Sequence, residues 1–269
     1  VWSTMGFSIK IFRNKRNNSE ITISQDSSDL IEKTEEIVEE NNNLIETKEE
    51  KKEDIDIKMT AIGDIMCHNT QYNDAYLADS KTYDFSYVFT DIEKYINSAD
   101  IAVGNLETTI SENHPYMGIN SKLNGGYNCN SPVEFLDALK YAGFNVLVAA
   151  NNHNLDAQRQ GHFDTIRHME EFEFDYTGIF KDEKQQRFLI KEKNGIKIGF
   201  LSYYTEHNKI KHDFSQKDIA MFFNKYTKET VQNDVQSLKN AGVDFIIAYI
   251  HWGIERVHTI TPFQEKTAK

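Results

Sequence analysis

The sequence predicts an α/β protein with a largely parallel sheet, and three observations support this prediction. Short apolar stretches that are typical of buried strands alternate with segments whose apolar residues recur at helical spacing. Two apolar stretches within residues 187–204 are joined by Asn194-Gly195, the strongest short signal of a hairpin. Polar residues follow four of the predicted strands, and open α/β sheets bind ligands at the edge where parallel strands end.

The strands are predicted from short apolar or alternating runs that are bounded by glycine or polar residues. Residues 57–63 alternate and end in glycine, whereas residues 100–105 and 144–149 are mostly apolar runs that lead into polar residues. The hairpin 187–204 and the strongly apolar run 243–253 complete the set.

The helices are predicted from apolar residues at helical spacing, in residues 87–99, 131–143, 158–172 and 228–242. The second of these has the clearest boundaries. Ser131 is the expected N-cap, Pro132 lies in the first turn and Gly143 follows the last turn. Strands that alternate with helices in this way indicate parallel pairing through helical crossovers.

Two segments precede the globular part, which we place at residues 57–269. Residues 1–18 are first apolar and then basic, and their opening 12 residues are too few to span a bilayer, so we expect a frayed terminus or the remnant of a membrane anchor. Residues 19–56 form an acidic linker, in which 29–56 holds twelve acidic residues, four lysines and no aromatic residue. Such a stretch buries too little apolar surface to offset its ordering entropy, so we expect a disordered, solvated tether, with a heptad coiled coil as the alternative.

The composition limits the partners. The chain has 269 residues, enough to bury a sizeable core, and a net charge of −12. A surface that binds nucleic acid normally shows as a basic patch, so we expect no nucleic-acid partner. The two cysteines, Cys67 and Cys129, are expected to be free buried thiols, although one disulfide is possible, so the cysteines do not decide the compartment.

Polar side chains follow four of the predicted strands. They are Asp64 after the first, Asn105 and Glu107 after the second, Asn151, Asn152, His153 and Asp156 after the third, and His251 and Glu255 after the last. Each of them alone has an ordinary structural explanation, such as a turn, a cap or a satisfied core histidine. Four such groups at four strand ends instead favour one shared site at the edge of the sheet.

These residue types suit a metal centre. Carboxylate, amide and imidazole groups without a cysteine are the ligands of Mn²⁺, Fe²⁺ or Zn²⁺. A carboxylate can bridge two ions, and two ions about 3.5–4 Å apart can clamp both the attacking and the leaving oxygen of a phosphoryl displacement. A nearby histidine that is not a ligand can act as general acid. The pattern therefore predicts one or two divalent ions and hydrolytic chemistry.

The motifs that carry these residues resemble those of a known family. The stretches 63-GDIM-66, 105-NLE-107, 150-ANNHNLD-156 and 251-HWGIE-255 are similar, in order and spacing, to the motif series of the CapA family of capsule and poly-gamma-glutamate synthesis proteins. The resemblance covers residues 57–269. It implies a fold like that of the calcineurin-like metallophosphoesterases, a sandwich of sheets flanked by helices.

The resemblance also implies a role for each residue. The metal ligands would be Asp64, Glu107 as the bridging acid, Asn152 and His251. His153 would be the catalytic proton donor to the leaving group. Residues that contact the ligands or the substrate would be Asn105, Asn151, Asp156 and Glu255.

The family's biology implies partners and a location. We expect the chain to act on poly-gamma-glutamate or another anionic polymer, beside membrane-bound capsule synthesis subunits, at the outer face of the cell membrane. A cytoplasmic protein that starts at Met5 is the alternative. Whether the reaction on the polymer involves a phosphoester, an amide or a polymer transfer stays open.

Two departures from the family pattern affect the site. Met66 stands where the related phosphoesterases have a histidine, and His68 has the wrong spacing to replace it. The chain also stops before the Gly-His-x-His type of motif that closes the family's last strand, so we expect a domain that is incomplete at its C-terminus.

Three functions follow from these observations. The first is a metal-dependent hydrolase-like protein of capsule polymer synthesis or export. The two departures motivate the second, a non-catalytic polymer-binding scaffold that keeps part of the metal site. The third is a general metal-dependent phosphomonoesterase.

The remaining polar residues have ordinary explanations. The loop 108–130 is expected either to face the polymer through Tyr116, Lys122 and Tyr127 or to be a surface loop. Five histidines are assigned to the surface or the core, namely His162, His168, His207, His212 and His258.

Overall fold

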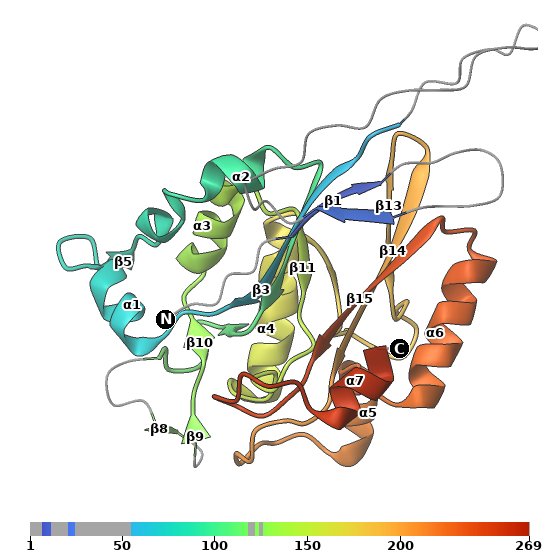
Figure 1. The fold of residues 1–269 in the computed structure, drawn as a ribbon. Helices are drawn as coiled ribbons and strands as arrows, with labels where there is room; N and C mark the ends of the chain where they lie inside the picture. The colour runs from blue at the N-terminus through green and yellow to red at the C-terminus, as the bar shows by residue number, and fades with distance from the viewer. Residues whose placement is uncertain (1–6, 12–20, 25–54, 118–121, 124–125, 269) are drawn as a thin grey trace, which may run out of the picture.

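The computed structural model describes residues 7–11, 21–24, 55–117, 122–123 and 126–268. In this part of the chain two sheets pack face to face, and helices lie against their outer faces (Figure 1). The larger sheet has the strand order β12-β11-β6-β3-β1-β2, and the smaller sheet has the order β13-β14-β15.

The strands of the two sheets follow the chain closely. The larger sheet consists of β1 (Phe7–Ile11), β2 (Ile21–Ser24), β3 (Lys58–Ile65), β6 (Ile101–Leu106), β11 (Val146–Val148) and β12 (Asp175–Thr177). The smaller sheet consists of β13 (Leu189–Lys193), β14 (Ile196–Tyr204) and β15 (Phe245–His251). The run β12-β11-β6-β3 is parallel, and so is the pair β14-β15, so the carboxyl ends of these strands define one edge in each sheet.

Helices and short strand pairs make up the rest. The helices are α1 (Asn69–Ala75), the 3₁₀ helix η1 (Ser86–Phe89), α2 (Glu93–Asn97), α3 (Glu134–Ala142), α4 (Gln158–Glu171), α5 (Gln216–Phe222), α6 (Lys228–Asn240) and α7 (Pro262–Ala268). The short strands are β4 (Tyr76–Leu77), β5 (Thr82–Tyr83), β7 (Thr109–Ile110), β8 (Lys122–Leu123), β9 (Gly126–Tyr127) and β10 (Asn130–Ser131).

Apolar side chains fill the space between the two sheets. Val103 of β6 and Val148 of β11 face Ile198 of β14, and all three are fully buried. The residues just before these valines, Ala102 and Leu147, point the other way into the core beneath the helices. Because β6 and β11 are buried on both faces, they read as continuous apolar runs in the sequence.

Each outer face carries its own helices. Leu139 of α3 and Met169 of α4 are fully buried against the larger sheet. On the smaller sheet, Leu238 of α6 lies over Gly199 of β14 so closely that a Cβ there would come within 2.7 Å of a Leu238 methyl carbon. The absence of a side chain at Gly199 thus lets α6 approach the sheet.

The structure confirms the α/β fold with a parallel sheet. The hairpin turn is also confirmed, with Asn194 and Gly195 both at positive φ (52° and 77°) as a two-residue hairpin turn requires. Gly143 ends α3 in the left-handed conformation, as predicted. The other predicted strands and the helices α4 and α6 are present, with small shifts at their ends.

Two local predictions are wrong. Residues 87–99 do not form one helix, because the backbone N–H and the hydroxyl of Thr90 both donate to the carbonyl of Tyr87 and close a tight turn between η1 and α2. Ser131 does not cap α3. It pairs in β10, and its hydroxyl lies 2.8 Å from the hydroxyl of Thr108.

The N-terminal part contributes two strands that were not predicted. β1 pairs antiparallel with β3, and β2 pairs with β1. Pairing with β1 covers a strand edge of β3 that would otherwise present unpaired backbone groups. Both strands come from the segments expected to be a terminus and a linker, and the heptad pattern of that linker lies outside the described residues.

The cysteines and isolated histidines occupy ordinary positions. Cys67 and Cys129 are free and buried, as expected. His162 and His168 are buried, His207 and His212 are half-buried, and His258 is exposed. Among the described residues, no helix is both long and apolar enough to cross a membrane.

His162 makes folding stability depend on pH. Its side chain is 1% exposed, lies among the rings of Phe222 and Phe223, and donates from Nε2 to the carbonyl of Phe180 at 2.9 Å. Burial lowers the pKa of His162 from 6.5 to about 4. The folded protein therefore keeps this imidazole neutral over a range in which the unfolded chain binds a proton.

We predict that the free energy of unfolding falls as the pH decreases from 6.5 towards 4, because only the unfolded chain takes up this proton. One such proton corresponds to a slope of about 1.4 kcal/mol per pH unit. Urea denaturation should show a shallower slope for His162→Gln and an unchanged slope for the exposed control His258→Gln. An equal slope in wild type and His162→Gln would contradict the assignment.

Candidate metal centre

Strands from both sheets end at the same place. The register pairs Asp64 of β3 with Asn105 of β6, and Tyr204 of β14 with His251 of β15. The register of β3 shifts between Ala61 and Asp64, and such irregularities re-aim side chains near functional sites. The carboxyl ends of the strands therefore bring polar residues of the two sheets together.

Asp64, Glu107 and His251 form the centre of this cluster. Asp64 Oδ1 lies 3.3 Å from His251 Nδ1, and Glu107 Oε1 lies 3.5 Å from His251 Nε2. Each residue offers one ligand atom, and these atoms all lie within 4.8 Å of one another. Two carboxylates and an imidazole at this spacing are able to hold one divalent cation.

The charges of this cluster are coupled. Burial, and then the negative charge of Asp64, raises the pKa of Glu107 to about 7. Burial works to raise the pKa of Asp64 as well, but hydrogen bonds with His251 and Asn105 outweigh it and lower that pKa. The two carboxyl groups thus repel each other, and a positive charge between them is favourable.

Two asparagine side chains hold the cluster in place. Asn105 donates to Asp64 Oδ1 at 2.7 Å, and Asn151 donates to the Asn105 side chain at 3.3 Å and to the carbonyl of Leu106 at 2.8 Å. The Asn151 oxygen accepts from the backbone N–H of His153 at 3.0 Å. Asn105 and Asn151 therefore position Asp64 and the backbone of His153, and their predicted contact with metal ligands or substrate stays a prediction.

His153 is oriented by a buried carboxylate. Its Nδ1 lies 2.7 Å from Asp156 Oδ2, which also accepts from the backbone N–H of Cys129 at 2.6 Å. The other ring nitrogen, Nε2, lies 3.9 Å from Glu107 Oε1. Burial works to lower the pKa of His153, but the hydrogen bond with Asp156 outweighs it and raises that pKa. The ring is thus fixed with one nitrogen toward the metal cluster.

Asn152 offers an unused acceptor. Its amide nitrogen donates to the Asn208 side chain at 3.1 Å, whereas its oxygen is buried and has no hydrogen-bond partner among the described residues. A buried acceptor without a partner is rare and calls for a partner such as an ion or water. The oxygen of Asn152 is therefore free to accept a further contact, and its predicted role as a metal ligand stays a prediction.

The structure does not bring Glu255 to the cluster. Its side chain is 86% exposed and pairs with Arg256 at 3.3 Å. His68 is exposed at the N-terminus of α1, where its backbone N–H donates to Gln71, so it does not replace the histidine that Met66 displaces. Glu255 and His68 therefore lie outside the group formed by Asp64, Glu107 and His251.

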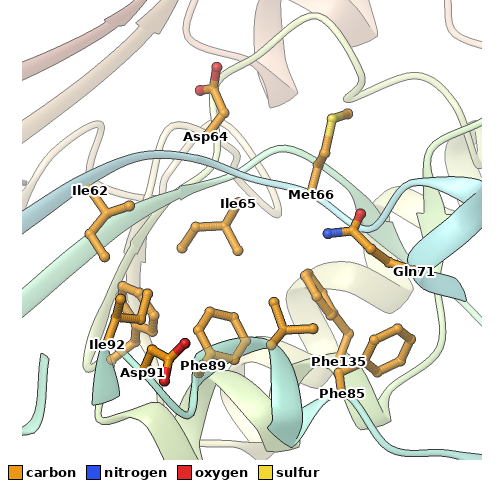
Figure 2. A pocket seen from close by; sticks show the side chains of 12 residues that line it. Ile62, Asp64, Ile65, Met66, Gln71, Phe85, Phe89, Asp91, Ile92 and Phe135 are labelled. Carbon is orange, nitrogen blue, oxygen red and sulfur yellow. The ribbon is translucent and has the colours of Figure 1, made fainter. Parts of the chain in front are cut away.

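Met66 lines an apolar cavity of about 280 Å³ next to the centre (Figure 2). Most of the lining consists of apolar side chains such as Ile65, Phe89 and Phe135. In Figure 2 the carboxylate of Asp64 points away from these rings. Asp64 lines the cavity and also belongs to the candidate cluster, so the cavity adjoins the cluster at this residue.

The long loop after β6 is only partly described. Tyr116 packs against the rings of Tyr72 and Tyr83, with centroids 6.1 and 6.0 Å away. Lys122 and Tyr127 lie in the β8-β9 pair, and the orientation of their side chains lies outside the described residues. The predicted contact of these residues with a polymer stays a prediction.

Asn208 is a site residue that the sequence analysis missed. Its backbone N–H donates to the carbonyl of Asn152 at 3.1 Å, and its side-chain nitrogen lies 3.3 Å from His153 Nδ1. Asn208 follows β14, whose carboxyl end meets the same edge as that of β15. A search for polar residues after the second strand of the hairpin, β14, would have found Asn208, because ligands bind where parallel strands end.

Fold and site together define an α/β sandwich with a carboxylate–histidine cluster at the carboxyl ends of its strands. Residues 58–269 match the family model described as "Bacterial capsule synthesis protein PGA_cap", and the chain belongs to this family. This confirms the family that the motifs predicted.

The chain is also similar to curated proteins over part of their length. The capsule biosynthesis protein CapA of Bacillus anthracis is 27% identical over 220 residues, which are 79% of this chain and 50% of that protein. The uncharacterized protein y4sH of Sinorhizobium fredii (strain NBRC 101917 / NGR234) is 29% identical over 128 residues, 47% of this chain and 25% of that protein. The chain thus spans half the length, or less, of these relatives.

Among solved structures, the calcineurin-like phosphoesterase YfkN from Bacillus subtilis is similar with a TM-score of 0.39 and 14% identity, over 75% of this chain and 64% of that chain. The sulfate thiohydrolase SoxB of Termus thermophilus is similar with a TM-score of 0.35 and 11% identity, over 65% of this chain and 32% of that chain.

We predict that Asn208→Ala weakens Mn²⁺ binding roughly 10- to 100-fold, the usual effect of removing a group that orients a ligand. The reason is that Asn152 loses the acceptor that holds its amide nitrogen. Calorimetric titration measures the affinity. Asn208→Asp keeps an acceptor and should restore most of it, and Lys209→Ala, an exposed neighbour, should behave as wild type. An unchanged affinity in Asn208→Ala would show that Asn208 does not contribute to metal binding.

Proposed function

We propose that this chain is a metal-dependent hydrolase of capsule polymer synthesis or export, and that its substrate is poly-gamma-glutamate or a related anionic polymer. One observation carries the proposal. Asp64, Glu107 and His251 offer ligand atoms within 4.8 Å of one another, and His153 Nε2 lies 3.9 Å from the Glu107 carboxylate. A metal cluster with an adjacent, oriented imidazole is the arrangement that hydrolysis of an ester or amide needs.

The residues present fit a divalent ion. Asp64, Glu107 and His251 supply two oxygens and a nitrogen, a set that suits Mn²⁺, Fe²⁺ or Zn²⁺. The unpartnered oxygen of Asn152 is a further ligand of the same hard type. When bound, such an ion polarises a substrate oxygen as a Lewis acid.

A bound cation also reduces the electrostatic repulsion between the site and an anionic substrate. The chain carries a net charge of −12, and the centre itself contains two carboxylates. These charges repel an anionic polymer, and the repulsion is strongest where water is excluded. A divalent ion held by Asp64 and Glu107 neutralises these two carboxylate charges and so removes the local repulsion.

The chain's own groups move the proton. Asp156 accepts from Nδ1 of His153 and so fixes the ring. Nε2 then faces the side of the centre where Glu107 lies, and from there it gives a proton to the leaving atom of the substrate. Asn208, within 3.4 Å of both ring nitrogens, restricts rotation of the imidazole.

The location and partners of the chain belong to the same proposal. Membership in a capsule synthesis family, and a relative named a capsule biosynthesis protein, support a role at the cell envelope. We infer that the chain works at the outer face of the membrane beside membrane-bound capsule synthesis subunits.

One observation favours a second function, a non-catalytic polymer-binding scaffold. Met66 stands at the position of a metal histidine, and its thioether side chain lines an apolar cavity. The group of described residues whose ligand atoms all lie within 4.8 Å of one another at Glu107 adds just Asp64 and His251. A scaffold would retain ion binding without turnover.

We predict that wild type binds one Mn²⁺ or Zn²⁺ in a calorimetric titration and that His251→Ala loses this binding, because the imidazole joins both carboxylates. His258→Ala removes an exposed histidine from the loop that follows β15 and should bind as wild type does. Unchanged binding in His251→Ala would place the ion elsewhere.

We further predict that His153→Ala lowers turnover by roughly 10²- to 10⁴-fold, the usual contribution of a general acid, while Mn²⁺ affinity changes little. Turnover is assayed with Mn²⁺ on poly-gamma-glutamate and on a panel of simple phosphomonoesters. Activity on the phosphomonoesters alone would indicate a general phosphomonoesterase. Binding of the polymer that survives chelation, without any turnover in wild type, would indicate the scaffold.

A further inference from the structure

A second cluster of potential ligand atoms also lies near Nε2 of His153. Cys129 Sγ is 3.8 Å from His153 Nε2 and 3.7 Å from Met117 Sδ. Both sulfur residues are 1% exposed, and His153 is 9% exposed. A thiol, a thioether and an imidazole thus meet in a buried space that the proposed reaction does not use.

The spacing of these atoms suits a shared ion. Zn²⁺ binds sulfur at about 2.3 Å and imidazole nitrogen at about 2.0–2.1 Å, so two such ligands of one ion lie roughly 3.6–4.0 Å apart in tetrahedral or trigonal geometry. The two distances from Cys129 Sγ match this range. Thiol and thioether sulfur favour soft cations over the hard ions that oxygen ligands prefer.

Asp156 supplies a second, independent observation. Its side chain is fully buried, and its Oδ1 has no hydrogen-bond partner among the described residues. The ligand atoms of Cys129, His153 and Asp156 all lie within 4.8 Å of one another. A buried carboxylate oxygen without a partner, next to a thiol and an imidazole, is the setting that a cation would complete.

We propose that Cys129, Met117 and His153 form a binding site for a soft, sulfur-seeking cation such as Cd²⁺, distinct from the centre at Asp64, Glu107 and His251. On binding, the thiol of Cys129 and the Nε2–H of the His153 imidazolium each release a proton to water, and the thiolate and Nε2 bond to the ion. Asp156 balances the charge and keeps the imidazole in its orientation.

Occupancy of this site has a consequence for the proposed reaction. The ion takes Nε2 of His153, the same atom that lies 3.9 Å from Glu107 and gives the proton in the proposed mechanism. A soft cation would therefore inhibit turnover without displacing Mn²⁺. This inhibition rests on the proposed function, whereas the binding itself does not.

Cys67 provides a matched control for the binding test. It is the other cysteine of the chain, it is equally buried at 1% exposure, and it is free. Its Sγ contacts the carbonyl of His68 at 3.8 Å, and it is not part of the group formed by Cys129, His153 and Asp156. Exchange of Cys67 therefore removes a buried thiol and leaves the proposed site intact.

The experiment titrates the full chain with Cd²⁺ and follows calorimetric heat and the ultraviolet absorption of the cadmium–thiolate bond. The His251→Ala background removes the oxygen-rich centre. In it, we expect one Cd²⁺ with the thiolate band, the same in Cys67→Ser, no band in Cys129→Ser, and about tenfold weaker binding in Met117→Leu. A band that survives in Cys129→Ser, or disappears in Cys67→Ser, would overturn the proposal.

Two further readouts keep the test decisive. The ¹¹³Cd resonance of the wild-type complex reports sulfur ligation without any variant, and a shift typical of oxygen ligands alone would also overturn the proposal, even if Cys129→Ser did not fold. Once turnover is established, Cd²⁺ should inhibit wild type and Cys67→Ser but not Cys129→Ser, each relative to its own untreated rate. Absence of turnover in every variant would count against the proposed hydrolase and leave the binding result standing.

Discussion

The apolar contact between the two sheets holds the candidate metal centre together. Asp64 and Glu107 follow strands of the larger sheet, whereas His251 ends a strand of the smaller one. Their separations of 3.3 and 3.5 Å therefore depend on how the sheets pack. That packing is set by fully buried side chains such as Val148 and Ile198, and tightly packed interiors of this kind resist small displacements. A rigid sandwich is what allows loops at its edge to place ligand atoms accurately.

Hydrogen bonds carry this rigidity from the strands to the loops. Asn105 and Asn151 connect Asp64 to the backbone of the loop that bears His153. Asn208 then ties the same loop to the smaller sheet through Asn152. These amides are buried or half-buried, so leaving them unpaired would be costly, and their mutual bonds favour one arrangement over alternatives. The exception is the unpartnered oxygen of Asn152, which is available to an ion.

His153 borders two chemically different environments. One contains the oxygen ligands around Glu107, and the other contains the sulfur atoms of Cys129 and Met117. Hard divalent ions favour the first set and soft ions the second, because ligand polarisability decides the preference when geometry permits both. The single imidazole thus connects a centre suited to hydrolysis with a pocket suited to a sulfur-seeking cation. Asp156 contributes to both sites, because its contact with Nδ1 fixes the orientation of the His153 ring.

The sequence alone determined the α/β class and most strands and helices, and it predicted that Asp64, Glu107 and His251 would meet, because periodicity and strand-end polarity are local patterns. It did not reveal the break between η1 and α2, where the Thr90 hydroxyl bonds to the carbonyl of Tyr87 three residues earlier, or the pairing of Ser131, whose hydroxyl meets that of Thr108 from a distant part of the chain. Only the tertiary structure separated Glu255 from the site and brought in Asn208 and Cys129. Which side chains meet across two sheets depends on long-range packing, and no local pattern records it.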